Sequence, residues 1–440
     1  MKKTIIALIL IFSLVFSLPA NAYQINDYEM HHNAGMLISL DTGNVLYSKN
    51  ADDRIYPASI TLLMTALVLT DNISDLESTL IPYTSSANNQ ILGTGSVVLN
   101  LKVGEEITAK DALAALLIPA CGDVAYAVAE YVGGDTDGFV DKMNAKAEAL
   151  GMTKTHFTNP IGLHDDDHYS TADDIYKLAS AAFENTTIKD MLSKTRYTVS
   201  ATNMTDERTI ITSNQLININ SSAYYRYAVC GKTGFTDKAG RCLVSTASYN
   251  GYNYMAIVLG ARTVGGVRYE FVDTANMYRW AFNNFQYKTV LDPSTPVTEA
   301  PVKLSADTDH IALCFEGGLK ALLPKEANAS TIDYKINLKS ESFNAPIKKG
   351  EVLGTADIYY AEEKIGTLGL VASQDVKSSA ILVLGNAAKE FFTSTFMIVI
   401  YIIVAVAAVI FGVHTLKLNS GKKKRREIKY IPLSKDDFDE

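Results

Sequence analysis

Three short segments of this chain carry side chains that could perform acyl-transfer chemistry. The segment 57–65, PASITLLMT, places Ser59 at the start of an apolar run with helical spacing. Amides at the N-terminus of such a helix could stabilise an oxyanion that develops when the serine attacks a carbonyl. The other two segments are 118–123, IPACGD, and 231–234, GKTG, which adds a cation and a hydroxyl. A lone KTG is most often part of a surface strand, so the three segments have significance only in combination.

Two hairpins and the helices between them must position these segments. Alternating apolar residues predict one hairpin over 36–49, around a DTGN turn, and a second over 242–261, around an Asn-Gly turn. Between the hairpins, helical spacing predicts helices over 60–70 and 109–132, the second of which ends at a Gly-Gly pair. We therefore predict an α+β fold in which distant segments close one antiparallel sheet, flanked by helices, with a helical lobe inserted. The GKTG segment is expected on an edge strand beside the serine.

The two ends of the chain predict export and membrane attachment. Residues 1–22 combine two lysines, an uncharged apolar run and a closing Ala-Asn-Ala, which is typical of a secretory signal peptide. Residues 391–416 contain no charged side chain and are long enough to cross a membrane as one helix. The cluster KKKRR at 422–426 should stay on the cytoplasmic side, so the tail 417–440, basic and then acidic, is expected inside. A buried core helix is the alternative at each end.

Composition and charge restrict the classes of partner. The net charge of −8 offers no basic surface for nucleic acid, so we exclude that class. The four cysteines have no metal-ligand spacing, and Cys230 and Cys242 could form a single bridge or remain buried free thiols. His164 and His168 lie in GLHDDDHYS, which could bind a metal but is more simply interpreted as a solvated loop. We therefore predict neither a metal nor another cofactor.

In order and spacing, the three segments resemble the S-x-x-K, S-x-N and K-T-G motifs of penicillin-binding serine hydrolases. More narrowly, the chain resembles the secreted D-alanyl-D-alanine carboxypeptidases of peptidase family S11, from about residue 35 to residue 282. Further matching segments are LKVGEEIT at 101–108, AEYVGG at 129–134, THFTNPIGLHDDDHYSTADD at 155–174 and GKTGFTDKAGRCLVSTA at 231–247. The segment APIKKGEVLG at 345–354 is similar to the C-terminal β domain of that family.

The resemblance implies a penicillin-binding or β-lactamase-like transpeptidase fold and suggests domain boundaries. We expect a carboxypeptidase-like domain over 23–286, a linker rich in Pro, Thr and Ser over 287–301, and a small all-β domain over 302–384. One transmembrane helix, 391–416, would follow. The expected location is the bacterial cell membrane, crossed once, with the folded domains outside the cytoplasm.

Two of the three motifs have lost their polar side chains. In the family, a lysine one helical turn after the nucleophile takes the proton of the serine, and Leu62 occupies that position here. Ala120 and Gly122 stand where the family has a proton-shuttling serine and an asparagine that contacts the lysine and the substrate. Cys121, between them, has no evident cationic neighbour that would activate it as a nucleophile. A positioned general base contributes about 10² to 10⁴ in rate, so efficient acylation of Ser59 is not expected.

The residues that remain predict a binding site. Lys232, Thr233 and Gly234 would supply a cation, a hydroxyl and a strand edge to a peptide that ends in a carboxylate. By resemblance, the backbone amides of Ser59 and Phe235 form an oxyanion hole, which side-chain changes do not remove. We therefore expect a catalytically impaired or inactive carboxypeptidase that binds peptidoglycan stem peptides ending in D-Ala-D-Ala. Such a site could also bind a β-lactam without acylation.

Two alternative functions stay open. The chain could be an active or slow D-Ala-D-Ala carboxypeptidase with an unrecognised base, for which Lys232 is a candidate. It could also be a structural envelope protein that no longer binds stem peptides. In each case the pocket is expected to be stable, because replacing three polar groups together leaves none of them buried without a partner.

Overall fold

The computed structural model describes residues 25–425 as two compact units. The first comprises the described residues up to Tyr287 together with Leu322–Glu326. The second comprises Lys288–Ala321 and the described residues from Ala327 onwards. The predicted signal peptide and the end of the predicted cytoplasmic tail lie outside the described residues.

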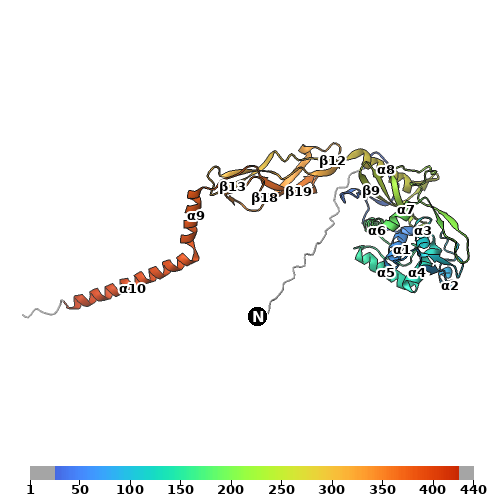
Figure 1. The fold of residues 1–440 in the computed structure, drawn as a ribbon, viewed down its shortest axis with the longest axis horizontal. Coiled ribbons are helices and arrows are strands. Elements are labelled where there is room, and N and C mark those ends of the chain that lie inside the picture. The colour runs from blue at the N-terminus through green and yellow to red at the C-terminus, as the bar shows by residue number, and fades with distance from the viewer. Residues whose placement is uncertain (1–24, 426–440) are drawn as a thin grey trace, which may run out of the picture. The chain divides into compact units, whose positions relative to one another are not determined.

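A five-stranded antiparallel sheet forms the centre of the first unit (Figure 1). Its strands, in spatial order, are β2 (Val45–Lys49), β1 (Ala34–Ser39), β9 (Tyr252–Ala261), β8 (Gly240–Tyr249) and β7 (Ala228–Thr236). β1 pairs with both β2 and β9, so the two predicted hairpins meet in one sheet. This confirms that distant segments close the sheet, and it places the GKTG segment on the edge strand β7.

Both faces of this sheet are buried, since successive side chains of its central strands enter different apolar clusters. In β9, Met255 and Ile257 belong to the cluster of the helical lobe, whereas Tyr254 and Ala256 pack with α8 (Tyr269–Asn284). This alternation follows from the two-residue repeat of a strand. The sheet is therefore a fixed layer between α8 and the lobe.

The helical lobe lies between β2 and β7 in sequence, and it carries the serine. Its helices are α1 (Leu62–Asn72), α2 (Ser85–Ile91), α3 (Ala109–Leu117), α4 (Gly122–Gly133), α5 (Thr136–Ala149), α6 (Ala172–Glu184) and α7 (Thr186–Ser193). The short strand pairs are β3 (Leu80–Pro82) with β4 (Glu106–Thr108) and β5 (Arg196–Val199) with β6 (Arg208–Ile211). α1 confirms the helix predicted over 60–70, and it is buried because α3, α4, α5 and α6 all contact it.

The prediction of one continuous helix over 109–132 is wrong. α3 ends at Leu117 and α4 begins at Gly122, with a turn between them. Pro119 has no amide hydrogen with which to continue the helix, and Ala120 leaves the helical conformation with a left-handed φ of 75°. The predicted stop was correct, since Gly134 ends α4 with a φ of 85°.

The second unit contains a six-stranded sheet, which confirms the predicted small β domain. Its strands, in spatial order, are β16 (Ile332–Leu338), β18 (Val352–Tyr360), β19 (Glu363–Ala372), β14 (His310–Phe315), β13 (Pro296–Lys303) and β17 (Phe343–Asn344). β13 begins inside the segment 287–301, for which a linker was predicted, because Ala300 and Val302 are buried in this sheet. The domain boundaries themselves remain predictions.

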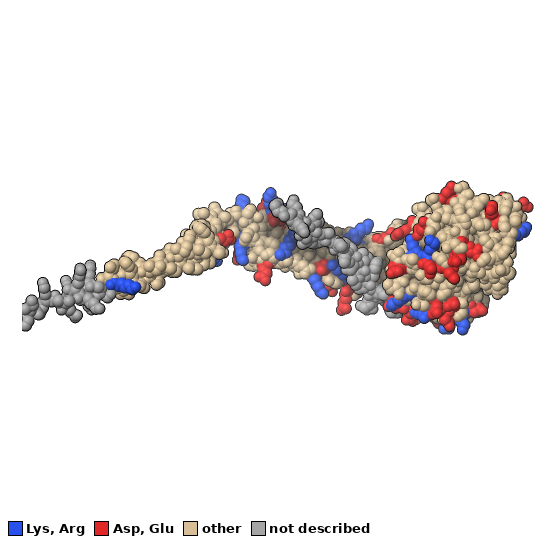
Figure 2. Space-filling view, turned by 90° about the horizontal axis from the view of Figure 1, so that it is seen from below, with Lys and Arg blue, Asp and Glu red and all other residues tan. Residues whose placement is uncertain are grey.

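Two helices follow this sheet, α9 (Ala380–Thr393) and α10 (Thr395–Arg425). α10 includes 24 residues, Thr395–Leu418, that are long and apolar enough to cross a membrane. The face of α10 seen in Figure 2 is tan along most of that stretch. This is the long apolar helix expected near the C-terminus, although it begins at Thr395 rather than at residue 391, because Ser394 ends α9 in an extended conformation.

Candidate active site

Ser59 lies in a one-turn 3-10 helix, η1 (Ala58–Thr61), that leads into α1. The serine is half-buried, and Ala58 before it has a left-handed φ of 49°. This conformation is strained for a residue other than glycine, and such strain is concentrated at functional turns. The turn is tightly enclosed, since a side-chain carbon on Gly162 would lie 1.9 Å from the carbonyl oxygen of Ala58. Glycine at residue 162 therefore allows the loop that begins the GLHDDDHYS segment to support the serine.

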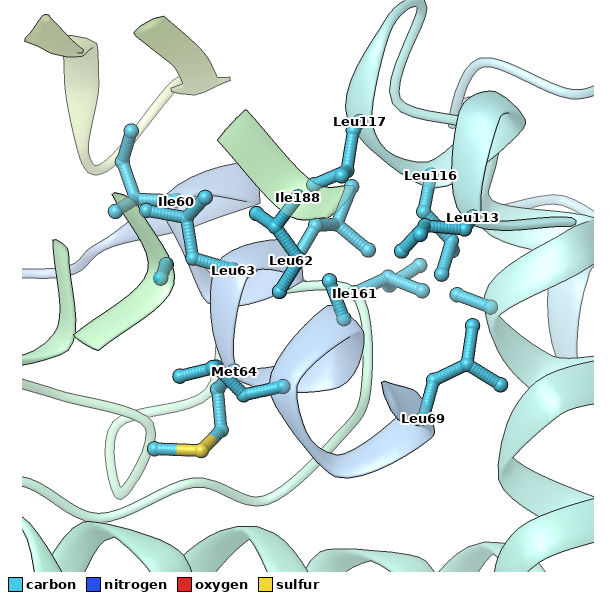
Figure 3. Packing of buried hydrophobic residues seen from close by; sticks show 14 of the residues in the cluster. Ile60, Leu62, Leu63, Met64, Leu69, Leu113, Leu116, Leu117, Ile161 and Ile188 are labelled. Carbon is cyan, nitrogen blue, oxygen red and sulfur yellow. The ribbon is translucent and has the colours of Figure 1, made fainter. Parts of the chain in front are cut away.

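Leu62, three residues after Ser59, is the first residue of α1 and is 1 % exposed. It belongs to the same buried apolar cluster as Ile161 and Ile188 (Figure 3). The side chain at this position is hydrocarbon packed among hydrocarbon. It has no group that could accept the proton of Ser59.

The second segment forms the turn between α3 and α4. The carboxylate of Asp123 accepts hydrogen bonds from the backbone amides of Leu99 and Leu101, at 2.9 and 3.1 Å, which ties this turn to the segment before β4. Burial raises the pKa of Asp123, although these amide hydrogen bonds oppose that shift. A side-chain carbon on Gly122 would lie 2.7 Å from Cδ1 of Ile91. Ile91 therefore occupies space that a larger side chain at residue 122 would need.

The edge strand β7 brings the third segment against the serine turn. A side-chain carbon on Gly234 would lie 3.0 Å from the amide nitrogen of Ser59, so glycine permits this close approach. Oγ1 of Thr233 lies 2.6 Å from Oγ of Ser213, in the loop between β6 and β7. The structure thus groups Ser59 with Thr233 and Gly234, as the motif order predicted, and it adds Ser213.

Lys232 is 1 % exposed, and its Nζ donates a hydrogen bond to the carbonyl oxygen of Thr233 at 3.0 Å. Burial lowers the pKa of Lys232 to about 7, because an ammonium is poorly stabilised away from water. Within the described part of the chain, Lys232 is not among the residues that line the cleft. Its predicted contact with a substrate carboxylate would therefore require the side chain to move.

A cleft of about 680 Å³ joins the three segments, a size suited to a small ligand or a short peptide. We call its lining residues from the helical lobe the lobe wall, and those that follow β6 the strand wall. The lobe wall consists of Ser59, Thr94–Val97, Pro119, Ala120, Gly122 and Ile161–His164. The strand wall consists of Ser213, Thr233–Lys238 and Arg268. The strand wall is therefore the side of the cleft with cationic side chains.

Three residues of the strand wall were not predicted from the sequence to belong to the site. Ser213 and Arg268 belong to no motif, and Lys238 follows the KTG without being part of it. Arg268 is oriented by Glu270, whose Oε1 lies 2.6 Å from its Nη2. An arginine just before α8 carries no sequence signal of its own, so only the fold reveals that it lines the cleft.

His168 has a structural role beneath η1. Its Nδ1 accepts a hydrogen bond from the amide of Thr158 at 3.1 Å, so the proton lies on Nε2, which is 2.9 Å from Oγ1 of Thr61. Burial lowers the pKa of His168 to about 4, so the ring is neutral near pH 7. His164 lines the cleft instead, edge-on to Tyr56. Across residues 25–425, no group of three or more His, Cys, Asp or Glu side chains is arranged to hold a metal ion.

The four cysteines are buried free thiols. Of the two possibilities left open for Cys230 and Cys242, the structure thus has the unbridged one. Burial raises the pKa of the Cys121 thiol, and the nearby Asp123 carboxylate raises it further. Lys232 is a cationic neighbour that was not expected from the sequence, but its lowering of this pKa is smaller than these two effects. A protonated, buried thiol is a poor nucleophile, so Cys121 is not suited to act as one.

The comparison with known families agrees with this geometry. Residues 21–263 match the peptidase S11 family, described as D-alanyl-D-alanine carboxypeptidase. Residues 285–378 match the C-terminal domain of penicillin-binding protein 5. Because the first match covers more than half of the chain, this protein belongs to the D-alanyl-D-alanine carboxypeptidase family, peptidase S11.

Individual relatives show the same relationship. The D-alanyl-D-alanine carboxypeptidase DacF of Bacillus subtilis is 28 % identical over 361 residues, which cover 80 % of this chain and 88 % of that protein. A D-alanyl-D-alanine endopeptidase of Pseudomonas aeruginosa is 33 % identical over 254 residues, or 57 % of this chain and 77 % of that protein. The crystal structure of the D-alanyl-D-alanine carboxypeptidase DacD from Francisella tularensis has a TM-score of 0.62 at 23 % identity, covering 82 % of this chain and 97 % of that one. This likeness confirms the predicted fold class.

Proposed function

We propose that this cell-wall protein of the D-Ala-D-Ala carboxypeptidase family binds peptidoglycan stem peptides but acylates Ser59 poorly or not at all. One observation carries the proposal: Leu62 lies buried in an apolar cluster at the position of the general base. A serine hydroxyl without a base is a weak nucleophile near neutral pH. Ala120 and Gly122, which line the cleft beside it, offer no polar side chain that could take over the proton transfer.

The strand wall supports the binding part of the proposal. Thr233 and Ser213 present hydroxyls, and Lys238 presents a cation to a peptide that ends in a carboxylate, while Arg268 beside it is already paired with Glu270. The close approach of Gly234 to the amide of Ser59 keeps a narrow site for a carbonyl oxygen, and the amides of Ser59 and Phe235 are its proposed donors. Such a cleft could also hold a β-lactam without reacting with it.

The position of the protein at the membrane is part of the same proposal. Thr395–Leu418 would cross the bilayer once, and the basic residues that follow would keep the C-terminus in the cytoplasm. The folded units would then lie outside the cytoplasm, close to the peptidoglycan. The small β domain would act as a spacer or as a docking surface.

A second candidate function is favoured by Lys232. An amine with a pKa near 7 is partly unprotonated at neutral pH and could accept a proton, so a slow carboxypeptidase with Lys232 as base is the competing proposal. The two proposals differ in one measurement, the release of D-alanine from a pentapeptide. A slow enzyme would show release that rises with pH through about 7, whereas the impaired protein would bind the peptide and release nothing.

The test compares the full chain in detergent with a restored variant, Leu62→Lys, Ala120→Ser and Gly122→Asn, by covalent labelling with a fluorescent penicillin. Because Ile91 fills the space next to Gly122, a second restored variant also carries Ile91→Ala. We expect labelling of a restored variant and none of the natural chain. Adding Ser59→Ala to the restored variant must abolish the label, since this identifies the acylated residue. Labelling of the natural chain at a comparable rate would overturn the proposal.

A further inference from the structure

A second cavity of the first unit lies where β7 begins, away from the residues that line the cleft. It has a volume of about 590 Å³ and is lined by Tyr224–Tyr227, by Tyr249 at the end of β8, and by Arg279, Phe282 and Asn283 of α8. We call it the tyrosine pocket. Tyr227 immediately precedes β7, and the cleft is reached at Thr233, six residues further along the strand. At about 3.3 Å per residue the two sites are roughly 20 Å apart, so they can hold different ligands.

The aromatic rings of the tyrosine pocket hold one another in place. The rings of Tyr227 and Tyr249 have centroids 4.1 Å apart, and Phe282 meets both of them edge-on at 5.8 and 5.7 Å. On the other side, Tyr225 is stacked on the buried Tyr278 at 5.8 Å. Because the rings are fixed before a ligand arrives, little conformational entropy is lost on binding.

Two guanidinium groups complete the tyrosine pocket. Arg226 lies 5.0 Å from the ring centroid of Tyr227, and Arg279 lies 5.6 Å from that of Tyr225. Both arginines are exposed. In the described residues, neither has a carboxylate within 4 Å, whereas the cleft residue Arg268 is paired with a glutamate. These cations are therefore available to an anionic ligand.

The chemistry of this lining selects one class of ligand. A pyranose ring has an apolar C–H face, which fits an aromatic ring, and a polar edge, which needs hydrogen-bond donors such as guanidinium and Asn283. Residues 25–425 contribute no aliphatic side chain to the pocket, as a lipid tail would require. Arg279 donates a hydrogen bond to the neutral Asn276 at 2.8 Å, but neither arginine is paired with a carboxylate, so the two cations favour a sugar that carries one.

We propose that the tyrosine pocket binds amino sugars with a carboxylate substituent, as in the glycan strand of peptidoglycan. The choice of this polymer rests on the proposed function, whereas the choice of an acidic sugar rests on the pocket alone. A chain held by the glycan would keep its cleft at a high effective concentration of stem peptides. The pocket would thus attach the protein to the wall independently of any catalysis.

The test uses N-acetylmuramic acid and N-acetylglucosamine, which differ only in the lactyl group that carries the carboxylate. Each sugar is titrated into the full chain in detergent, and binding is followed by saturation-transfer NMR. We expect the acidic sugar to bind about tenfold more tightly, the size of effect that one good ionic contact supplies. The double variant Arg226→Gln and Arg279→Gln should remove this preference, while Tyr249→Ala should weaken binding of both sugars.

Matched controls are Arg196→Gln and Tyr131→Ala, which alter an exposed arginine and an exposed tyrosine elsewhere in the first unit. Neither should change the affinity for either sugar. Equal affinity for the two sugars, or binding that Tyr249→Ala does not weaken, would overturn the inference, as would a preference of the pocket for anionic vesicles or proline-rich peptides. Stem-peptide binding is measured in parallel, so a failure of glycan binding alone leaves the proposed function standing.

Discussion

The lobe wall and the strand wall of the cleft differ in the polar side chains that they carry at the motif positions. In the lobe wall and the helix below it, the positions that would carry the base and its partners are Leu62, Ala120 and Gly122, and the space is filled by packed hydrocarbon. In the strand wall, Thr233 is still hydrogen-bonded to Ser213 and the cations remain. Under the proposed function, this contrast separates the groups that would move protons from those that would recognise a ligand. Leu62, Ala120 and Gly122 themselves have no side-chain polar atom that burial could leave unpaired.

The largest effect is expected for Leu62→Lys alone, which places an ammonium among the apolar side chains of the lobe. A buried charge without a partner should lower the free energy of unfolding by about 3 to 5 kcal/mol. Thermal unfolding followed by the fluorescence of Trp280, the one tryptophan of the sequence, measures this in the first unit. Leu62→Met is the matched control, with a cost below about 1.5 kcal/mol. If the lysine is tolerated as well as the methionine, the lobe is not the dry, packed region described above.

A comparably local test concerns the support of the serine turn. Gly162→Ala should cost about 3 kcal/mol, because the new side-chain carbon meets the carbonyl of Ala58 and residue 162 has a left-handed φ of 81°. Gly134→Ala is the matched control, since Gly134 has a similar φ of 85° but open space around it. Gly134→Ala should lower the free energy of unfolding by only about 1 to 2 kcal/mol, which is the cost of a left-handed backbone for alanine. Equal costs for the two variants, read from the same unfolding curves, would mean that the turn is not tightly enclosed.

Two buried residues behind the cleft, Lys232 and His168, should differ in the pH range over which they affect stability. Burial lowers the pKa of Lys232 from 10.5 to about 7 and that of His168 from 6.5 to about 4. Between each pair of values the unfolded chain binds a proton that the folded chain does not, so the free energy of unfolding rises with pH by up to about 1.4 kcal/mol per pH unit. Lys232→Met should flatten the rise between pH 7 and 10.5, and His168→Gln the rise between pH 4 and 6.5. A slope that persists in its own variant would contradict the assigned burial.

The smallest expected effect concerns the hydroxyl pair of the strand wall. Thr233→Val keeps the shape of the side chain and removes its hydrogen bond to Ser213, which should cost about 1 kcal/mol of stability. Retention of a D-Ala-D-Ala pentapeptide should fall about tenfold, since a lost hydrogen bond to a charged group is worth about 1.5 to 3 kcal/mol. Equilibrium binding of a fluorescent pentapeptide measures this, and Thr263→Val, outside the cleft, is the control. Unchanged retention in Thr233→Val would remove the strand wall from the binding site and favour a purely structural envelope protein.

Much of this architecture could be predicted from residues alone, because it depends on short-range patterns. The two hairpins, the helix after Ser59 and the edge strand with the GKTG segment follow from alternation, helical spacing and turn residues. That residue 62 is a leucine, without an amine, is visible in the sequence without any structure. The continuous helix predicted over 109–132 was wrong because helical spacing continues across Pro119, although a proline cannot donate the hydrogen bond that would continue the helix.

The remaining features depend on contacts between residues far apart in the chain, which no local pattern contains. Ser213 and Arg268 reach the cleft only because the sheet and the loops around it bring them to Thr233 and Gly234. The burial of Lys232, and with it a lowered pKa, results from the packing of the lobe against β7. The sequence by itself thus determined which side chains are present at the motif positions and which elements carry them. Tertiary structure alone decided which of those side chains are exposed to solvent, line the cleft or contact one another, because burial and proximity are properties of the packed chain.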